Sequence, residues 1–190
     1  MKVKNSLDDQ KLIQKAQKGN VTAFEKLVYR YDKRVMALIR QSVANDEDAK
    51  EIYQDVFIKV FNSIEQYHNK SSFYTWLFRI TINCCLNFHQ KKSTRNDQLK
   101  QSIDTDAFPS AKTNQNPESS IINRELREVI QNGIDTLSPK EKMVFTLKHY
   151  EGLKIREISN IFEETDGSIK NCLFRGIQKM KVHLTPYINL

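Results

Sequence analysis

The chain has 190 residues, enough for one domain of ordinary size or two small ones. Its 39% hydrophobic and 28% charged residues, with five Gly and four Pro, favour a mostly helical globular protein over a β-sheet protein or a disordered chain. Thirty Lys and Arg against 23 Asp and Glu give a net charge of +7, which suits a polyanionic partner but fits an ordinary basic protein equally well.

Two helices are predicted at the start of the chain. Ser6 and Asp9 form a capping pair for the first, which ends near Gly19. Thr22 and Glu25 form a similar pair for the second. The apolar residues of both helices recur at three- and four-residue steps: Leu12, Ile13, Ala16, Phe24, Leu27, Val28, Tyr31, Val35, Leu38 and Ile39.

Two further helices complete the first half. The third begins at the capping pair Asn45 and Asp48, and the fourth spans about Phe73 to Lys91. Their apolar faces are predicted at Ala49, Ile52, Tyr53, Val56, Phe57, Val60, Phe61 and Ile64, and at Trp76, Leu77, Ile80, Cys84 and Phe88. Residues 45–65 hold six acids and two lysines, so the third helix suits a basic protein surface, or is simply solvated.

Residues 93–124 carry equal numbers of acidic and basic side chains and little apolar material. We interpret most of this stretch, 93–120, as a flexible linker between a first domain, 1–92, and a second, 121–190. The alternative is a surface excursion of one larger domain, although such long structureless loops are uncommon.

The second half is predicted to hold four short helices. Ser138, Pro139 and Glu141 form a capping box with proline in the first turn, and that helix ends at Gly152. The apolar positions are Ile122, Leu126, Val129, Ile130, Ile134 and Leu137; Val144 and Leu147; Ile155, Ile158 and Phe162; and Ile169, Leu173, Ile177, Met180 and Leu184. The whole chain is therefore predicted to be all-α.

The last two helices, separated by a turn at 163–166, have the dimensions of a helix-turn-helix. Residues 165–183 contain four basic side chains and one acid. The final helix is expected to expose polar residues that can bind base edges and phosphates: Ser168, Lys170, Asn171, Arg175, Gln178 and Lys179. An ordinary helical hairpin with a solvated face is the alternative.

A second pattern lies at the start of the fourth helix. Aromatic residues cluster beside Lys70, and polar residues follow at intervals of four: the rings are Tyr67, Phe73, Tyr74, Trp76 and Phe78, and the stripe is Arg79, Asn83, Asn87 and Lys91. If exposed, such rings stack on unpaired bases while Lys and Arg hold phosphates. The alternative is that Trp76 and Phe73 belong to the core.

No catalytic residue, metal site or cofactor is predicted. His68, His89, His149 and His183 lack metal-ligand spacing, and Cys84, Cys85 and Cys172 contain no CxxC pair. No apolar stretch approaches the roughly 18 residues of a membrane span. These features predict a cytoplasmic protein that is not an enzyme.

Together these segments resemble the extracytoplasmic-function branch of the sigma-70 family. Residues 48–61 are similar to the polymerase-docking helix of region two, and residues 73–80 with Asn83 and Asn87 to the segment that melts and reads the minus-ten element. Residues 137–141, 150–153, 155–158 and 167–171 resemble region four, which reads the minus-thirty-five element. The resemblance implies core RNA polymerase, promoter DNA and an anti-sigma factor as partners.

The resemblance also implies site residues. Polymerase contacts fall on Asp48, Glu51, Ile52, Gln54, Asp55, Phe57 and Ile58. Minus-ten contacts fall on Tyr67, Asn69, Lys70, Phe73, Tyr74, Trp76, Arg79, Asn83, Asn87, Lys91 and Lys92, with residues 67–73 as the loop that captures a flipped base. Minus-thirty-five contacts fall on Arg156, Thr165, Gly167, Ser168, Lys170, Asn171, Phe174, Arg175, Gln178 and Lys179.

Three positions depart from the family pattern. Ser159 stands where Ala is usual, Glu163 where Gly is frequent, and Cys172 where Arg is frequent, which places one DNA contact in doubt. The main alternative function is a stand-alone helix-turn-helix regulator, which would bind duplex DNA tightly without polymerase. A nucleic-acid-processing enzyme is a further alternative, but it requires a catalytic constellation that the sequence lacks.

Overall fold

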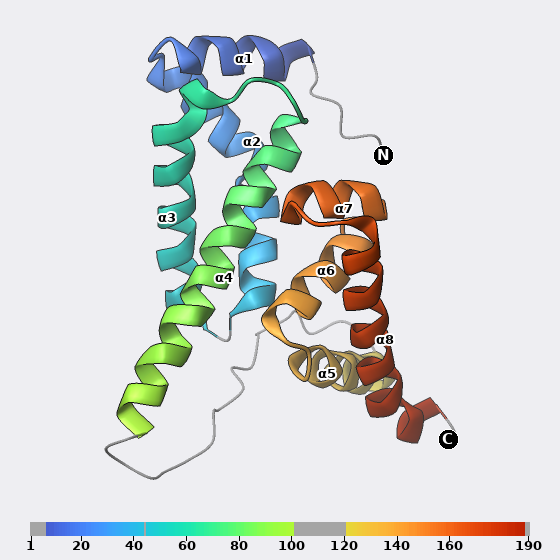
Figure 1. The fold of residues 1–190 in the computed structure, drawn as a ribbon. Coiled ribbons are helices and arrows are strands. Elements are labelled where there is room, and N and C mark those ends of the chain that lie inside the picture. The colour runs from blue at the N-terminus through green and yellow to red at the C-terminus, as the bar shows by residue number, and fades with distance from the viewer. Residues whose placement is uncertain (1–6, 44, 101–120, 189–190) are drawn as a thin grey trace. The chain divides into compact units, whose positions relative to one another are not determined.

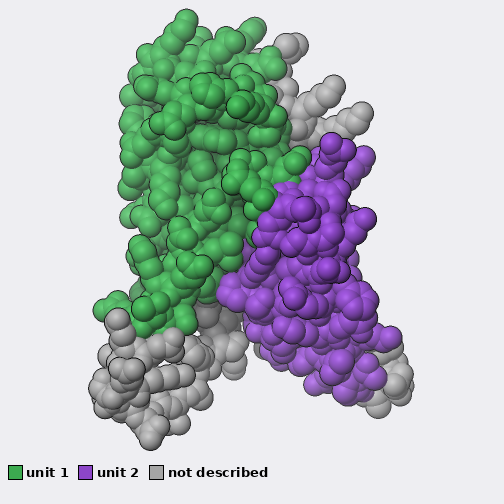
Figure 2. Space-filling view, in the orientation of Figure 1, with its two compact units in different colours: residues 1–104, 160–163 green, residues 105–159, 164–190 purple. Residues whose placement is uncertain are grey.

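The computed structural model describes residues 7–43, 45–100 and 121–188, and every regular element within these ranges is a helix (Figure 1). The chain divides into two compact units, one of residues 1–104 with 160–163 and one of residues 105–159 with 164–190 (Figure 2). The all-α prediction with two helical regions is confirmed. None of the described helices is long and apolar enough to cross a membrane.

The first unit contains α1 (Leu7–Gln17), α2 (Val21–Ser42), α3 (Asp46–Ser63), the short 3-10 helix η1 (Ile64–Gln66) and α4 (Phe73–Lys100). Helices α2, α3 and α4 pack against one another, and α1 crosses one end of this bundle, where it contacts α2 and η1 (Figure 1). The bundle core includes Leu27, Val35, Ile39, Val56 and Val60, all nearly inaccessible to solvent.

Local capping explains where two of these helices begin. Asn45 Oδ1 accepts the Asp48 N–H at 2.7 Å, so the predicted cap of α3 is confirmed. The predicted pair Thr22 and Glu25 is wrong, because Asn20 Oδ1 accepts the Ala23 N–H at 2.8 Å and α2 begins at Val21. Ser6 lies outside the described residues.

The Asp9 side chain makes contacts beyond α1, and its predicted capping pair with Ser6 stays a prediction. Its carboxylate is buried and accepts a hydrogen bond from the Tyr31 hydroxyl at 2.9 Å, and it also pairs with Arg30. A carboxylate beside a buried phenol disfavours the phenolate, so burial and Asp9 together raise the pKa of Tyr31. Asp9 therefore ties α1 to α2.

Helix α4 differs from its prediction in length and in orientation. It continues to Lys100 instead of ending at Lys91, so residues 93–100 of the expected linker are helical and 101–120 lie outside the described residues. Its buried residues are Phe73, Tyr74, Leu77, Phe78, Thr81, Ile82, Cys84 and Cys85. The predicted positions Leu77 and Cys84 are thus confirmed, whereas Trp76, Ile80 and Phe88 are half-buried. The core side of α4 is thus rotated from the one that we expected.

The second unit contains α5 (Ile121–Asp135), α6 (Pro139–His149), the part of α7 (Ile155–Phe162) up to Ser159, and α8 (Asp166–Ile188), with α5 and α6 packed against α8. The predicted capping box is confirmed: Ser138 Oγ accepts from the Glu141 N–H, and Glu141 accepts from the Ser138 N–H at 3.0 Å. Val144, Leu147, Ile158 and Ile169 are fully buried, but Ile177, predicted to face inward, is 39% exposed.

Gly176 offers a test of this packing. It is buried within α8, and a Cβ there would lie 3.8 Å from Glu141 Cβ and 3.8 Å from Leu137 Cδ2, which are ordinary contacts. Because alanine is a better helix former, Gly176→Ala should stabilise the second unit by about 0.5–1 kcal/mol and raise its Tm by several degrees. Thermal unfolding followed by circular dichroism measures this.

Gly133→Ala is the matched control on α5. Its Cβ would lie 3.0 Å from Met180 Sδ and 3.1 Å from His183 Cδ2, closer than side chains normally approach. We expect crowding to offset the gain in helix propensity there. A Gly176→Ala protein that unfolds below the parent temperature would contradict the described α6–α8 packing.

Candidate nucleic-acid and protein-binding surfaces

The aromatic cluster at the start of α4 is mostly core. Tyr67, Phe73, Tyr74 and Phe78 are each at most 3% exposed, so the prediction that these rings form an exposed stacking surface is wrong. Tyr67 packs against Phe73 at 5.6 Å and against Trp76 at 5.2 Å between ring centroids. Trp76 is half-buried and keeps part of its surface available.

The loop that leads into α4, residues 67–72, combines buried and exposed parts. Asn69 has a positive φ of 55°, a conformation that Asn tolerates better than most residues. His68, Asn69 and Lys70 are exposed, which agrees with the predicted accessibility of Asn69 and Lys70. The loop therefore presents an amide and an ammonium group shortly after Tyr67, whose ring packs against Trp76.

The polar stripe of α4 lies on its accessible side. Arg79 is half-buried, and Asn83, Asn87 and Lys91 are exposed. Lys92, also predicted to bind DNA, is half-buried: its Nζ lies 2.8 Å from Asp48 Oδ2 and 5.7 Å from the centre of the Phe88 ring. Four members of the stripe thus share one side of the helix, while Lys92 is engaged by α3.

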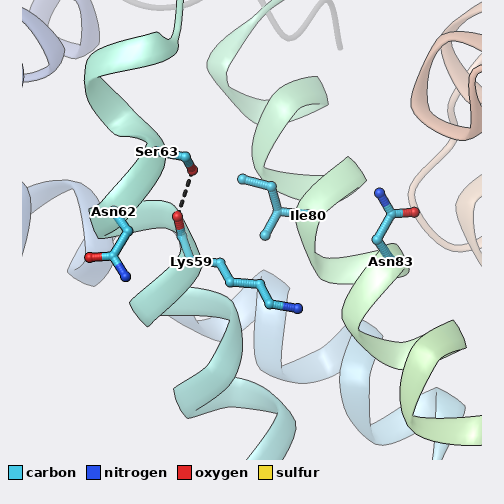
Figure 3. A pocket seen from close by; sticks show the side chains of 5 residues that line it. All are labelled: Lys59, Asn62, Ser63, Ile80 and Asn83. Atoms are coloured by element: carbon cyan, nitrogen blue, oxygen red, sulfur yellow. Dashed lines mark hydrogen bonds between the residues drawn. The ribbon is translucent and has the colours of Figure 1, made fainter. Parts of the chain in front are cut away.

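A pocket of about 380 Å³ opens between α3 and α4 (Figure 3). It is lined by Lys59, Asn62, Ser63, Ile80 and Asn83, and the Lys59 and Ile80 side chains extend into the space between the helices. A second pocket of about 490 Å³ shares Lys59 and is lined also by Glu51, Asp55, Asn87, Lys91 and Arg95, among others. Amide side chains can bind base edges, and ammonium groups can bind phosphates.

The three pocket residues from α3 were not among the predicted site residues. Lys59, Asn62 and Ser63 lie on a helix whose acidic character suggested a protein partner. Lys59 does not stand out in the sequence, because Lys50 interrupts the acids of that helix as well.

The three cysteines are buried and unpaired in disulfides. Burial raises the pKa of Cys85 to about 12 and raises the pKa of Cys84, which Lys59 partly opposes. Burial also raises the pKa of Cys172. These groups are thiols at neutral pH and contribute packing rather than nucleophiles.

The predicted docking residues on α3 divide between surface and core. Glu51, Gln54, Asp55 and Ile58 are exposed, and Asp48 and Phe57 are half-buried. Ile52 is 2% exposed and belongs to the core, so its predicted contact with a partner is wrong. Phe61, predicted on the inward apolar face of α3, is instead 51% exposed and adds an apolar group to this surface, where it packs edge-on against Phe24 at 5.1 Å.

The α7–α8 pair forms the predicted helix-turn-helix. Glu163 has a φ of 57°, which accounts for the frequent glycine at this turn position. Thr165 caps α8, because its Oγ1 accepts the Ser168 N–H at 3.2 Å. Asp166, expected in the turn, is the first residue of α8 and accepts a hydrogen bond from the Ser159 hydroxyl.

The predicted contact residues of α8 lie on its accessible side. Ser168 is half-buried, and the other predicted contact residues are exposed: Thr165, Gly167, Lys170, Asn171, Phe174, Arg175, Gln178 and Lys179, together with Arg156 on α7. Cys172 is 1% exposed and faces the core with Ile169 and Gly176. In this chain, position 172 therefore contributes to packing, and the expected loss of one DNA contact relative to the family stays a prediction.

A buried carboxylate orients two of these basic residues. Glu141 lies 2.7 Å from Lys179 Nζ and 3.7 Å from Arg175 Nε, while also completing the α6 cap. Burial alone would raise the pKa of Glu141, but hydrogen bonds from Lys179 and Ser138 outweigh it and lower that pKa. Glu141 stays ionised and links the start of α6 to the exposed side of α8.

Comparison with known proteins places these surfaces in a family. Residues 27–95 match the model of sigma-70 region 2, and residues 127–180 match that of sigma-70, region 4. The ECF RNA polymerase sigma-E factor of Escherichia coli K12 is 31% identical over 186 residues, which cover 96% of this chain and 97% of that protein.

Two solved structures share the fold. CnrH in complex with the cytosolic domain of CnrY superposes with a TM-score of 0.67 at 18% identity, covering 94% of this chain and 98% of that one. The sigma factor RpoE in complex with the anti-sigma factor NepR from Bartonella quintana superposes with a TM-score of 0.62 at 17% identity. The match covers 85% of this chain and 96% of that one. The chain thus belongs to the extracytoplasmic-function group of the sigma-70 family, as a non-enzymatic sigma factor that directs core RNA polymerase to promoters.

Proposed function

We propose that three surfaces divide the work of this sigma factor. The acidic side of α3 docks on core RNA polymerase, the 67–72 loop with α4 opens and reads the minus-ten element, and α8 reads the minus-thirty-five element. The observation that carries this division is the placement of charge: Glu51 and Asp55 are exposed on α3, whereas Lys170 and Arg175 are exposed on α8. The negative surface of α3 is complementary to a basic protein surface, and the positive surface of α8 is complementary to DNA.

The minus-ten assignment rests on the pocket between α3 and α4. Unstacking a promoter base costs a few kcal/mol, and stacking on an aromatic ring returns about 1–3 kcal/mol. Since four of the predicted rings are core, Trp76 is the predicted ring left to supply stacking, and hydrogen bonds must supply the remainder. Asn62 and Asn83 line the pocket and carry amides that can pair with a base edge.

Asn83→Ala tests the pocket. We expect roughly tenfold less open complex at a responsive promoter, because one amide contact with a base is lost. Permanganate reactivity of melted thymines reports opening, and a pull-down with core polymerase should be unchanged. Gln66→Ala, an exposed polar residue outside the pocket, is the control. Undiminished melting with Asn83→Ala would show that the pocket takes no base.

The same surfaces suit an inhibitor. The RpoE structure holds an anti-sigma factor, and we propose that this chain also has one, which covers the α3 or α8 surface and so excludes polymerase or DNA. Because core polymerase and the chromosome are in the bacterial cytoplasm, the chain acts there. Competition between a purified inhibitor and core polymerase for the chain would test this arrangement.

A further inference from the structure

The 67–72 loop is held at both ends. At its start, Tyr67 is buried, and its hydroxyl donates a hydrogen bond to the Ser71 carbonyl at 2.7 Å. At its end, Ser72 caps the start of α4: its Oγ accepts the Thr75 N–H at 3.1 Å and its carbonyl accepts the Trp76 N–H at 3.0 Å. The exposed part of the loop is therefore short and has few conformations available.

A side chain from α1 fixes the start of this loop. Gln17 Nε2 donates to the Ile64 carbonyl at 3.0 Å and to the Tyr67 carbonyl at 2.8 Å. The Ile64 carbonyl lies where α3 passes into η1 and also accepts the Tyr67 N–H at 3.1 Å, and the Tyr67 carbonyl directly follows η1. A side-chain amide has two N–H donors, so a single Gln17 can serve both carbonyls.

Gln17 is itself firmly placed. It is the last residue of α1, whose inner side is buried through Ile13 and Ala16. The Asp9–Tyr31 hydrogen bond ties α1 to α2, and the Tyr31 ring lies 5.5 Å from that of Phe73, the first residue of α4. The two Gln17 hydrogen bonds thus connect the loop to the same core from which α4 begins.

We infer that Gln17 is a positioning residue for promoter opening. Its amide sets the place of the 67–72 loop relative to α4, so that Asn69 and Lys70 meet the same unpaired strand as the pocket at Asn83. Gln17 binds no DNA itself. It also precedes residue 27, where the match to region 2 begins. The inference depends on the proposed role of this loop at the minus-ten element.

Gln17→Leu removes both donors while keeping a side chain of similar size. We expect roughly fivefold to thirtyfold less open complex on a duplex promoter, measured by permanganate reactivity with core polymerase, because two hydrogen bonds are lost. On the same promoter with a premelted minus-ten region, whose thymines react without polymerase, complex formation is measured by gel shift instead, and the defect should shrink to about twofold or less, since no base must then be captured from the duplex. Core polymerase binding should not change.

Two further variants test whether the defect comes from the loss of hydrogen-bond donation by the Gln17 side chain. Gln17→Glu keeps the shape but has no N–H, so it should be at least as defective as Gln17→Leu. Gln14→Leu makes the same change at an exposed position on α1 and should behave like the parent. Circular dichroism at the assay temperature checks that each variant is folded.

The outcomes are distinct. If the parent melts duplex promoter and Gln17→Leu melts it equally well, Gln17 has no positioning role. An equal loss on duplex and premelted templates, or weaker polymerase binding, would show a general structural defect and also overturn the inference. If the parent itself opens no promoter with core polymerase, the proposed function fails, and not only the role of Gln17.

Discussion

Reversing the charge of Glu51 and Asp55 to Lys should reduce binding to core RNA polymerase at least about a hundredfold, because basic side chains would then face the basic surface that these acids are proposed to meet. Both side chains are exposed on α3, so the substitutions should leave the bundle folded. A pull-down of core polymerase by the tagged variant measures the loss, and circular dichroism checks the helix content.

Glu65→Lys is the matched control for this experiment. Glu65 is an exposed acid of the same unit that lies in η1, outside the docking surface. Polymerase binding by this variant should match the parent, which would show that an acid-to-lysine reversal elsewhere in the unit, with half the change in net charge of the double variant, does not itself weaken binding. Retained binding by the Glu51 and Asp55 variant would remove α3 from the polymerase interface.

Two substitutions on α8 should have effects of different kinds. Asn171→Ala is expected to weaken binding of the holoenzyme to its own promoter by about 1–3 kcal/mol and to relax the preference at one base pair, because an amide that pairs with a base edge is lost. Lys170→Ala should weaken binding to all DNA sequences. It should also make the dependence of affinity on salt concentration shallower, by the amount expected for about one phosphate contact. Both residues are exposed on the first turns of α8.

The comparison requires affinities at several salt concentrations for the native promoter and for one with an altered minus-thirty-five element. Lys181→Ala, an exposed basic residue farther along α8, serves as the control and should change little. An Asn171→Ala protein that loses equal affinity for both promoters would contradict base reading by this residue.

Local signals in the sequence were reliable where the structure depends on neighbouring residues. The caps at Asn45 and Ser138 involve partners three residues away, and both were predicted correctly. The start of α2 was missed because Asn20, Thr22 and Glu25 all offer capping groups, and backbone geometry selects Asn20. Local patterns thus identify helix ends, but competing caps in one segment are hard to rank.

Long-range packing explains the larger errors. Phe73, Tyr74 and Phe78 are core because the side of α4 that faces α2 and α3 is set by tertiary contacts, and α4 has apolar residues on more than one side. The inward orientation of Cys172 has a similar origin. Gln17 and Lys59 were missed for a further reason: each acquires its partners from a segment distant in the sequence.

The most direct test of sigma function is run-off transcription from bacterial genomic DNA, with core RNA polymerase in the presence and absence of the purified protein, followed by mapping of the new transcript starts. We expect new starts that depend on the protein and share two upstream elements at a constant spacing. The contradictory result is that no new start appears while the protein alone binds duplex DNA with high affinity, as a stand-alone helix-turn-helix regulator would.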